Sequence, residues 1–348
     1  MNNLTLYGWN ETLFQQKQSS INNHLSHGRV STVNRTCYEV VGEEGCYTCE
    51  LSGNMLYGRA ADEFPCTGDW VLFQAFDGEK GIIIDMLPRE KTLYRRKSGT
   101  IAEKQAIATH VDKAFIVQSL DNNFNPRRVE RLMLQVYNEK ISPILVLTKS
   151  DLGFDEEKVK ASLSHFGDKL PVFFTSIYSD EQIEELKKTI APGETIVFVG
   201  SSGVGKSSLI NAFLGKEILA TSHISDSTGK GRHTTTRGEL MLLPDSGILI
   251  DTPGTREFGV TADDNNSLLE IMDIASLTEK CHFSDCTHSN EPGCAVIEAV
   301  ESGLLDESVY NSYLKLQREA RYFSTSGEEK RKREKSLSKV IKKYFKNP

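Results

Sequence analysis

The stretch that decides the fold of this chain is Gly200-Ser201-Ser202-Gly203-Val204-Gly205-Lys206-Ser207. It satisfies G-x-x-x-x-G-K-[ST], follows the apolar run Thr195–Val199 and precedes a helical pattern over Ser208–Leu214. A strand, a glycine-rich loop and a helix in this order bind phosphate, because the loop amides and the helix N-terminus converge on the anion. We therefore predict a nucleotide site in which Lys206 reaches the β- and γ-phosphates and Ser207 ligates Mg²⁺.

The phosphate loop lies in a region where short apolar runs alternate with helical patterns. Strands are expected at residues 114–117, 144–147, 172–175, 196–199 and 248–250. Helices are expected between them, at residues 127–138, 156–165, 180–189 and 206–214. This alternation predicts a parallel sheet with helices on both faces, and we assign it to an α/β domain over residues 109–260.

Thr148-Lys149-Ser150-Asp151 follows the apolar run 144–147, at the strand end where open α/β sheets bind ligands. It resembles the [NT]-K-x-D motif that recognises guanine. A carboxylate at Asp151 can accept two hydrogen bonds from the N1–H and N2–H₂ edge of guanine, and adenine offers no matching pair. The Lys149 stem would cover the base. The alternative is a lysine and an aspartate that only cap a turn.

Three shorter segments extend the predicted site. Asp251-Thr252-Pro253-Gly254 matches D-x-x-G, in which Asp251 would hold Mg²⁺ and the Gly254 amide would meet the γ-phosphate. Thr234-Thr235-Thr236 can supply the threonine that closes on Mg²⁺, with Thr235 as our choice, and Thr175-Ser176 resembles the loop that faces guanine O6. The predicted nucleotide-binding residues are Thr148, Lys149, Ser150, Asp151, Thr175, Ser176, Gly200, Ser201, Ser202, Gly203, Val204, Gly205, Lys206, Ser207, Ser208, Asp251 and Gly254.

The order of these motifs is unusual. Ras-like GTPases begin with the phosphate loop and have the guanine motif near the end. Here residues 148–151 and 175–176 precede residues 200–207, 234–236 and 251–254, which indicates a circular permutation. Such a rearrangement is tolerated because domain termini usually lie close together at the surface.

A metal site is predicted after the D-x-x-G segment. Cys281-x₄-Cys286-x-His288-x₅-Cys294 offers three thiolates and one imidazole, the ligand set of a structural zinc ion. His282 is a rival ligand, but a neighbour of Cys281 would strain one tetrahedral site. We reject Cys46-x₂-Cys49 as a second site, because an odd offset in a strand sends the two side chains to opposite faces.

The rest of the chain is divided by its pattern. Five short strands expected within residues 27–90 predict a closed barrel of the OB type, preceded by an extension over residues 1–26. Residues 91–108 are interpreted as a linker, and residues 261–348 as a helical zinc domain with a basic tail. Between Lys330 and Lys346 the tail has nine basic residues and one acid, a pattern of either a polyanion contact or a solvated helix end.

Composition excludes several classes of protein. The 348 residues carry a net charge of −7, which argues against a simple nucleic-acid binder. No apolar run approaches the roughly 20 residues of a membrane span, and the first residues do not form a signal peptide. Seven cysteines, an odd number, favour a reducing compartment. We expect a cytoplasmic protein, a monomer, without membrane contact.

The barrel, the permuted motifs and the Cys-Cys-His-Cys cluster together resemble the YjeQ/YloQ (RsgA) family of circularly permuted GTPases over nearly the whole chain. Residues 231–236, Gly-Arg-His-Thr-Thr-Thr, also match the switch segment of that family. The resemblance implies that the chain binds GTP and GDP and acts on the small ribosomal subunit late in its maturation. It also implies ribosomal RNA binding, and GTP hydrolysis that stays slow until the subunit stimulates it. The barrel and the basic tail would contact the RNA, largely through phosphates.

Slow turnover is also expected from the residues themselves. Thr255 stands where Ras-like enzymes have the glutamine that positions water, and a threonine is too short for that role. Beside Lys206 and Thr235, His233 is therefore a candidate catalytic residue; it is equally a loop histidine that contacts RNA or nothing. Two alternative functions remain, a P-loop ATPase or kinase and a nucleotide-dependent RNA-binding module with negligible turnover.

Overall fold

The computed structural model describes residues 3–57, 63–96, 104–121, 124–215, 238–244, 247–252 and 265–324. The chain forms two compact units, one of Met1–Arg95 with Lys104–Phe258 and the other of Arg96–Glu103 with Gly259–Pro348. The barrel and the α/β domain, which the sequence analysis separated, thus belong to the same unit.

The N-terminal extension contains a 3₁₀ helix, η1 (Leu4–Tyr7), and the helix α1 (Glu11–Ser19). The Asn10 side chain caps α1 by accepting a hydrogen bond of 3.0 Å from the amide of Leu13. Trp9 lies edge-on to Trp70 with 4.8 Å between the ring centroids. The extension therefore packs against the barrel, although its sequence shows little periodicity.

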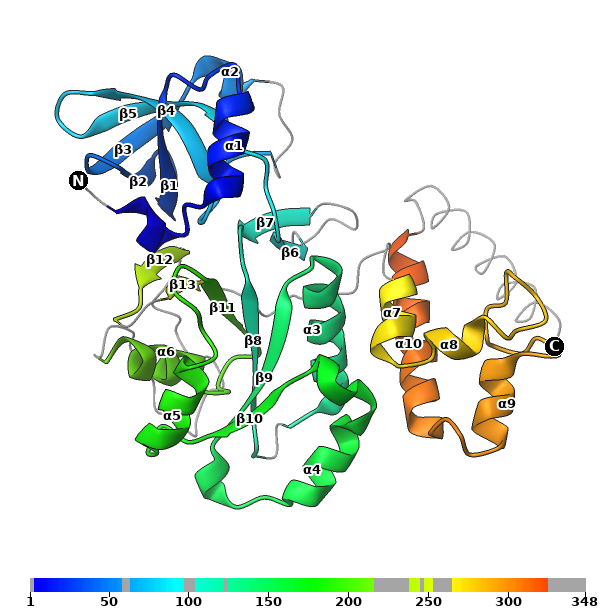
Figure 1. Ribbon diagram of the computed structural model, residues 1–348. Helices are drawn as coiled ribbons and strands as arrows, with labels where there is room; N and C mark the ends of the chain where they lie inside the picture. Colours follow the sequence, from blue (N-terminus) through cyan, green and yellow to red (C-terminus); the bar gives the residue numbers. More distant parts are fainter. Residues whose placement is uncertain are drawn as a thin grey trace, which may run out of the picture. The chain divides into compact units, whose positions relative to one another are not determined.

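The barrel has the five strands that were predicted. They are β1 (Ser26–Val33), β2 (Tyr38–Gly42), β3 (Cys46–Leu51), β4 (Trp70–Phe76) and β5 (Lys80–Met86), with the short helix α2 (Gly53–Leu56) after β3. The strands run in the order β1-β2-β3-β5-β4, and a pairing between β1 and β4 closes the barrel (Figure 1). Side chains such as Val40, Cys49 and Phe73 fill the interior. Cys49 is buried and Cys46 is exposed, as the odd spacing in a strand predicts.

The segment interpreted as a linker contains two strands that pair with each other, β6 (Leu93–Arg96) and β7 (Lys104–Ala108). Leu93, Ala106 and Ala108 are buried there. Basic and polar residues around these few apolar positions concealed the strands in the sequence.

The α/β domain is built on five parallel strands in the order β10-β9-β8-β11-β13. These strands are β8 (Lys113–Ser119), β9 (Ser142–Thr148), β10 (Val172–Thr175), β11 (Thr195–Val199) and β13 (Ile248–Asp251). An antiparallel strand that the sequence analysis missed, β12 (Glu239–Leu242), pairs with β13. Its apolar run, residues 240–243, was an available signal, although Leu240 is the one residue of the strand that is buried.

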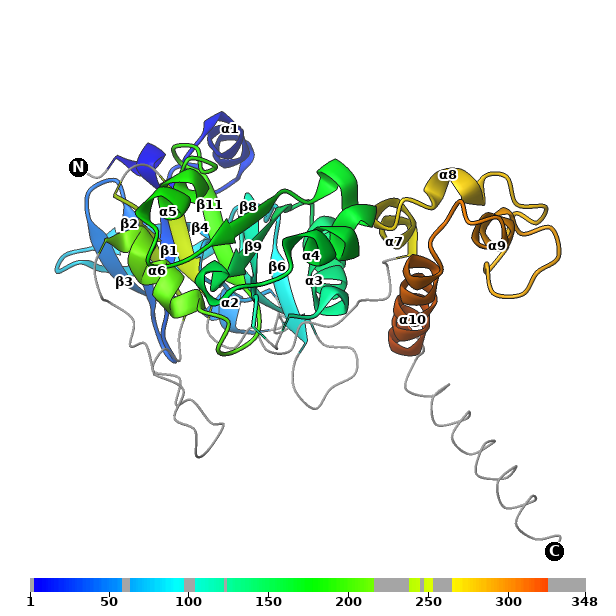
Figure 2. The same cartoon turned by 90° about the horizontal axis from the view of Figure 1, so that it is seen from below.

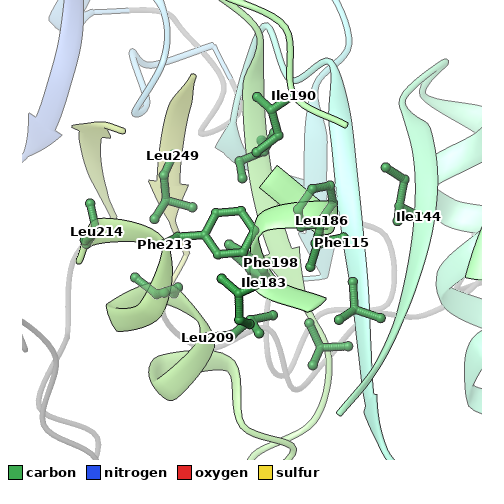
Figure 3. Close-up of a cluster of buried hydrophobic side chains, with 14 of the residues drawn as sticks. Phe115, Ile144, Ile183, Leu186, Ile190, Phe198, Leu209, Phe213, Leu214 and Leu249 are labelled. Carbon is green, nitrogen blue, oxygen red and sulfur yellow. The ribbon is translucent and has the colours of Figure 1, made fainter. Parts of the chain in front are cut away.

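Helices cover both faces of the parallel strands, as expected (Figure 1). They are α3 (Pro126–Asn138), α4 (Glu156–Leu163), α5 (Asp180–Lys187) and α6 (Lys206–Leu214), with the 3₁₀ turns η2 (Ser150–Leu152) and η3 (Ser164–Lys169). Figure 3 shows Ile183 and Leu186 of α5 and Phe213 of α6 gathered around Phe115 and Phe198 of the sheet. This core fixes α6, and with it the phosphate loop, against the sheet.

The barrel and the parallel sheet share one hydrogen-bonded ladder, because β1 pairs with β12 through Thr32 and Glu239. The buried guanidinium of Arg29, also on β1, makes a second connection between the barrel and the sheet. It donates hydrogen bonds to the carbonyl oxygens of Tyr7 (2.6 Å) and Gly68 (3.0 Å) and to the Thr195 hydroxyl (3.0 Å). Burial lowers the pKa of Arg29 to about 10, so it stays charged at neutral pH.

The second unit is helical, with α7 (Asn265–Ile271), α8 (Ala275–Thr278), α9 (Ala295–Glu301) and α10 (Glu307–Ser324). Figure 2 shows α7 against α10, and Leu268, Ile271, Val296, Tyr313 and Leu316 are buried in this unit. Among the described residues, no helix has the length and apolar character to cross a membrane.

Candidate functional site

The phosphate loop turns sharply between β11 and α6, and its glycines make this possible. Gly200, Gly203 and Gly205 have φ angles of 153°, 81° and 95°, a region that side chains disfavour. A Cβ atom on Gly200 would lie 2.4 Å from the carbonyl oxygen of Val117 in β8. The loop is thus held directly against the neighbouring strand, with α6 beginning at Lys206.

The ammonium group of Lys206 is directed across this loop. It donates hydrogen bonds to the carbonyl oxygens of Gly200 (2.7 Å) and Ser201 (2.5 Å). Ser207 and Ser208 follow in the first turn of α6, where helix amides have no intrahelical partner. The arrangement can bind an anion with one lysine, the helix N-terminus and the loop amides together.

The predicted guanine segment is tied to the phosphate loop. The Thr148 hydroxyl donates to the carbonyl oxygen of Val204 at 2.6 Å, so the end of β9 holds the loop after β11. The Asp151 carboxylate accepts a hydrogen bond of 2.6 Å from the hydroxyl of Ser176, which follows β10. Two loops that the sequence places far apart therefore meet at Asp151.

A further carboxylate, which the sequence analysis did not identify, orients Lys149. Asp121 follows β8 and forms an ion pair of 2.7 Å with the Lys149 ammonium. The Asp121 carboxylate also accepts a hydrogen bond of 2.8 Å from the Ser119 hydroxyl. Lys149 itself has a left-handed backbone, with φ at 62°. An aspartate two residues beyond a buried strand was the available signal.

Gln182, on α5, is a second residue that the sequence analysis did not identify. Its side-chain oxygen accepts a hydrogen bond of 2.8 Å from the amide of Ser176 and a longer one, 3.4 Å, from the Ser150 hydroxyl. In the loop 175–176, which was predicted to face guanine O6, the Ser176 amide therefore has a partner within the protein. Thr175 is buried and pairs with Thr148 in the sheet.

Asp251 ends β13 at the same edge of the sheet. Burial raises the pKa of its carboxyl group, the positive charge of Lys206 lowers it, and Glu239 raises it further. Glu239 lies directly opposite Asp251 in the ladder between β12 and β13. A divalent cation beside Asp251 would relieve the repulsion of these carboxylates, so the donor set fits Mg²⁺.

The other predicted residues of this site lie outside the described part of the chain. They are His233, Thr234, Thr235, Thr236 and Gly254, and the basic tail from Lys330 to Lys346 also falls there. Their roles stay predictions.

The predicted zinc ligands come together in the second unit. The ligand atoms of Cys281, Cys286, His288 and Cys294 lie within 4.8 Å of one another. The sulfur atoms of Cys281 and Cys294 are 3.9 Å apart, and each lies 3.5 Å from Nδ1 of His288. Two thiolates on one tetrahedral zinc, each at about 2.3 Å, would be about 3.8 Å apart, so these residues fit the ion.

Neighbouring residues hold the loop that carries His288. The hydroxyl of Tyr310 on α10 donates to the His288 carbonyl oxygen at 2.7 Å. The Glu291 carboxylate accepts hydrogen bonds from the amides of Thr287 (3.0 Å) and Ser289 (2.9 Å). His282, the rival ligand, is exposed and packs edge-on to Phe283, outside the cluster.

The parallel sheet, the phosphate loop before α6 and the order of the motifs define a circularly permuted P-loop GTPase. The model of the RsgA GTPase family matches residues 86–261, which is more than half of the chain. The chain belongs to this family.

Full-length relatives and solved structures agree with this assignment. A Bacteroides thetaiotaomicron protein named small ribosomal subunit biogenesis GTPase RsgA 1 is 60% identical, with 98% of this chain and 96% of that protein covered. The Leptospira interrogans protein named small ribosomal subunit biogenesis GTPase RsgA is 35% identical, with coverages of 99% and 97%. YjeQ from Thermotoga maritima has a similar structure, with a TM-score of 0.64, 27% identity and coverages of 85% and 98%. YloQ, a circularly permuted GTPase, shares the fold with a TM-score of 0.64 at 23% identity, over 88% of this chain and 98% of that chain.

Proposed function

We propose that this chain hydrolyses GTP to GDP and phosphate on the small ribosomal subunit, in the late maturation of that subunit. The observation that carries the proposal is the position of Asp151, which Ser176 holds at the sheet edge where the phosphate loop also lies. A carboxylate fixed there can read the donor edge of guanine, which adenine lacks. The names of the full-length relatives support the subunit as the partner.

In this proposal Lys206 binds the β- and γ-phosphates, while Ser207, Asp251 and Thr235 hold Mg²⁺, which would neutralise charge on the phosphates. Gly254 would contact the γ-phosphate. Intrinsic turnover is slow, because Thr255 replaces the glutamine of Ras-like enzymes, and His233 is the candidate helper. The remaining nucleotide contacts are those predicted from the sequence, with Asp121 added as the residue that orients Lys149.

The charge of the barrel limits where RNA phosphates can bind. Residues 27–90 contain eleven acidic and five basic residues, and one of the five is the buried Arg29. A surface of this sign repels a phosphate backbone. We therefore place the ribosomal RNA contact mainly on the basic tail, and we propose a cytoplasmic monomer with one structural zinc ion.

The experiment compares the wild type with Asp151→Asn and with Asp168→Asn, an exposed control. Asp151→Asn is expected to weaken GTP and GDP binding at least 100-fold, on the order of the discrimination that one lost polar contact gives, and to leave ATP binding unchanged. Hydrolysis is measured with and without small ribosomal subunits. Equal affinity of the wild type for ATP and GTP would contradict the proposal, and negligible turnover with subunits would favour a binding module instead.

A further inference from the structure

The barrel loop Cys66–Asp69 lies against the strands that carry the GTPase site. Thr67 is buried, and its hydroxyl donates a hydrogen bond of 3.2 Å to the carbonyl oxygen of Gly238, immediately before β12. The carbonyl oxygen of Thr67 accepts a hydrogen bond of 3.2 Å from the amide of Thr109, which follows β7 and precedes β8 by four residues. One barrel residue therefore holds two segments of the α/β domain.

Gly238 links Thr67 to the end of β13. A Cβ atom on Gly238 would lie 3.1 Å from the Thr67 hydroxyl and 3.4 Å from the carbonyl oxygen of Asp251. The next residue, Glu239, pairs with Asp251 on one side and with Thr32 of the barrel on the other. Two contacts thus lead from the barrel to the residue that we propose as a magnesium ligand.

The loop also contacts β13 directly, through Gly68. A Cβ atom there would lie 2.5 Å from the Thr109 carbonyl oxygen and 3.0 Å from Cδ1 of Ile250, the residue before Asp251. Gly68 has φ at 99°, so glycine is required both by the backbone and by this close approach.

The barrel side of the loop is held firmly. Arg29 donates to the Gly68 carbonyl oxygen at 3.0 Å, and Asp69 forms a buried ion pair of 2.7 Å with Arg89. The Asp69 carboxylate also accepts a hydrogen bond of 2.7 Å from the amide of Cys66. The loop can therefore act as a fixed support for β12 and β13, with its geometry set by the barrel.

We propose that Thr67 is a positioning residue for GTP hydrolysis, which holds Gly238 so that β12 and β13 present Asp251 to Mg²⁺. The inference rests on the proposed function and adds a barrel residue to the same site. The barrel then sets the geometry of the metal site, and anything that binds the barrel can alter the hydrolysis rate through this loop.

The test compares Thr67→Val, which removes the hydroxyl at nearly constant shape, with Thr67→Ser, which keeps it. Thr48→Val is the control, because Thr48 is exposed on β3 and its hydroxyl bonds only to Glu39 among the described residues. For Thr67→Val we expect the Mg²⁺ concentration that half-saturates the GDP complex to rise about fivefold, the effect of one lost hydrogen bond. We also expect kcat to fall by a similar factor while KM for GTP changes less than twofold, with Thr67→Ser close to wild type.

Two outcomes would overturn the inference. One is a Thr67→Val protein with the wild-type Mg²⁺ dependence and kcat. The other is an equal loss in Thr67→Val and Thr67→Ser that follows only their thermal midpoints, which would make Thr67 merely structural. Thr67→Ala serves as a second variant if Thr67→Val does not fold. A wild type that binds no GTP would instead contradict the proposed function, so the two failures are distinguishable.

Discussion

The candidate nucleotide site and the cluster of three cysteines and one histidine are assembled in opposite ways. Segments between Thr148 and Asp251 form the first, and they meet only because parallel strands end at one edge of a sheet. The Cys/His cluster comes from the single stretch Cys281–Cys294. The first site therefore depends on the packing of a whole domain, whereas the second can organise its own surroundings once a metal binds.

Metal removal should give the largest effect and separate the two sites completely. Structural zinc contributes on the order of 10 kcal/mol to the folding of a small domain, so Cys294→Ser should lose zinc and unfold residues 265–324. Hydrogen exchange and elemental analysis measure this, with Cys37→Ser as the control. GDP binding should change less than twofold. Retained amide protection in residues 265–324 without zinc would refute the idea that this unit depends on its metal.

The reciprocal variant is Lys206→Ala. Loss of this ammonium should reduce kcat/KM for GTP about 1,000-fold, because a charge placed against the phosphates acts most strongly in the transition state. Zinc content and the exchange of residues 265–324 should stay at wild-type values. Lys188→Ala, at the exposed C-cap residue of α5, provides the matched control for hydrolysis rates. A loss of less than tenfold would mean that Lys206 does not contact the phosphates.

Acid should destabilise the first unit through His110, at the junction of barrel and sheet. Burial, and after it the charge of Arg29, lower the pKa of His110 to about 4. Between pH 6.5 and 4, His110 is protonated in the unfolded chain but stays neutral in the folded chain. The free energy of unfolding therefore falls by roughly 3 kcal/mol as the pH drops through this range.

His110→Asn should remove that part of the pH dependence, since asparagine tolerates the φ of 52° found there. Urea unfolding at pH 7 and pH 4 is followed by tryptophan fluorescence. Both tryptophans, Trp9 and Trp70, report on the barrel and not on the zinc cluster. Parallel pH curves for the variant and the wild type would show that His110 is not responsible.

The smallest effect is expected at Thr148, which joins two parts of the nucleotide site. Thr148→Val leaves the carbonyl oxygen of Val204 without its partner at 2.6 Å, and GDP should bind about tenfold more weakly. Thr148→Ser keeps the hydroxyl and should bind within twofold of wild type. Equal affinities for all three proteins, measured by GDP titration, would show that the hydrogen bond from Thr148 to Val204 does not contribute to GDP binding.

The sequence predicted the parts of the molecule that leave a local signal. Glycine spacing identified the phosphate loop, alternating apolar runs identified the parallel strands, and the Cys/His spacing identified a cluster whose atoms converge. Each of these signals lies within about ten to fifteen residues, the range over which periodicity can be read.

Features that depend on the partner segment could not be predicted in the same way. Strand β12 is held because β1 and β13 lie on either side of it, and its own short apolar run, residues 240–243, does not show which strands it pairs with. Asp121 and Gln182 became site residues only when β8 and α5 were placed beside the guanine segment. An aspartate and a glutamine are common surface residues, so only their positions in the folded chain identify these two as parts of the site.

The ladder between β1 and β12 has a consequence for any attempt to cut the protein into parts. A fragment that begins at Lys104 would leave Glu239 of β12 without Thr32 as its ladder partner, and unpaired strand edges recruit other chains. It would also lose the guanidinium that binds Thr195. The barrel therefore covers the edge of the sheet within the same chain. A protein truncated before Lys104 should self-associate under conditions in which the intact protein does not.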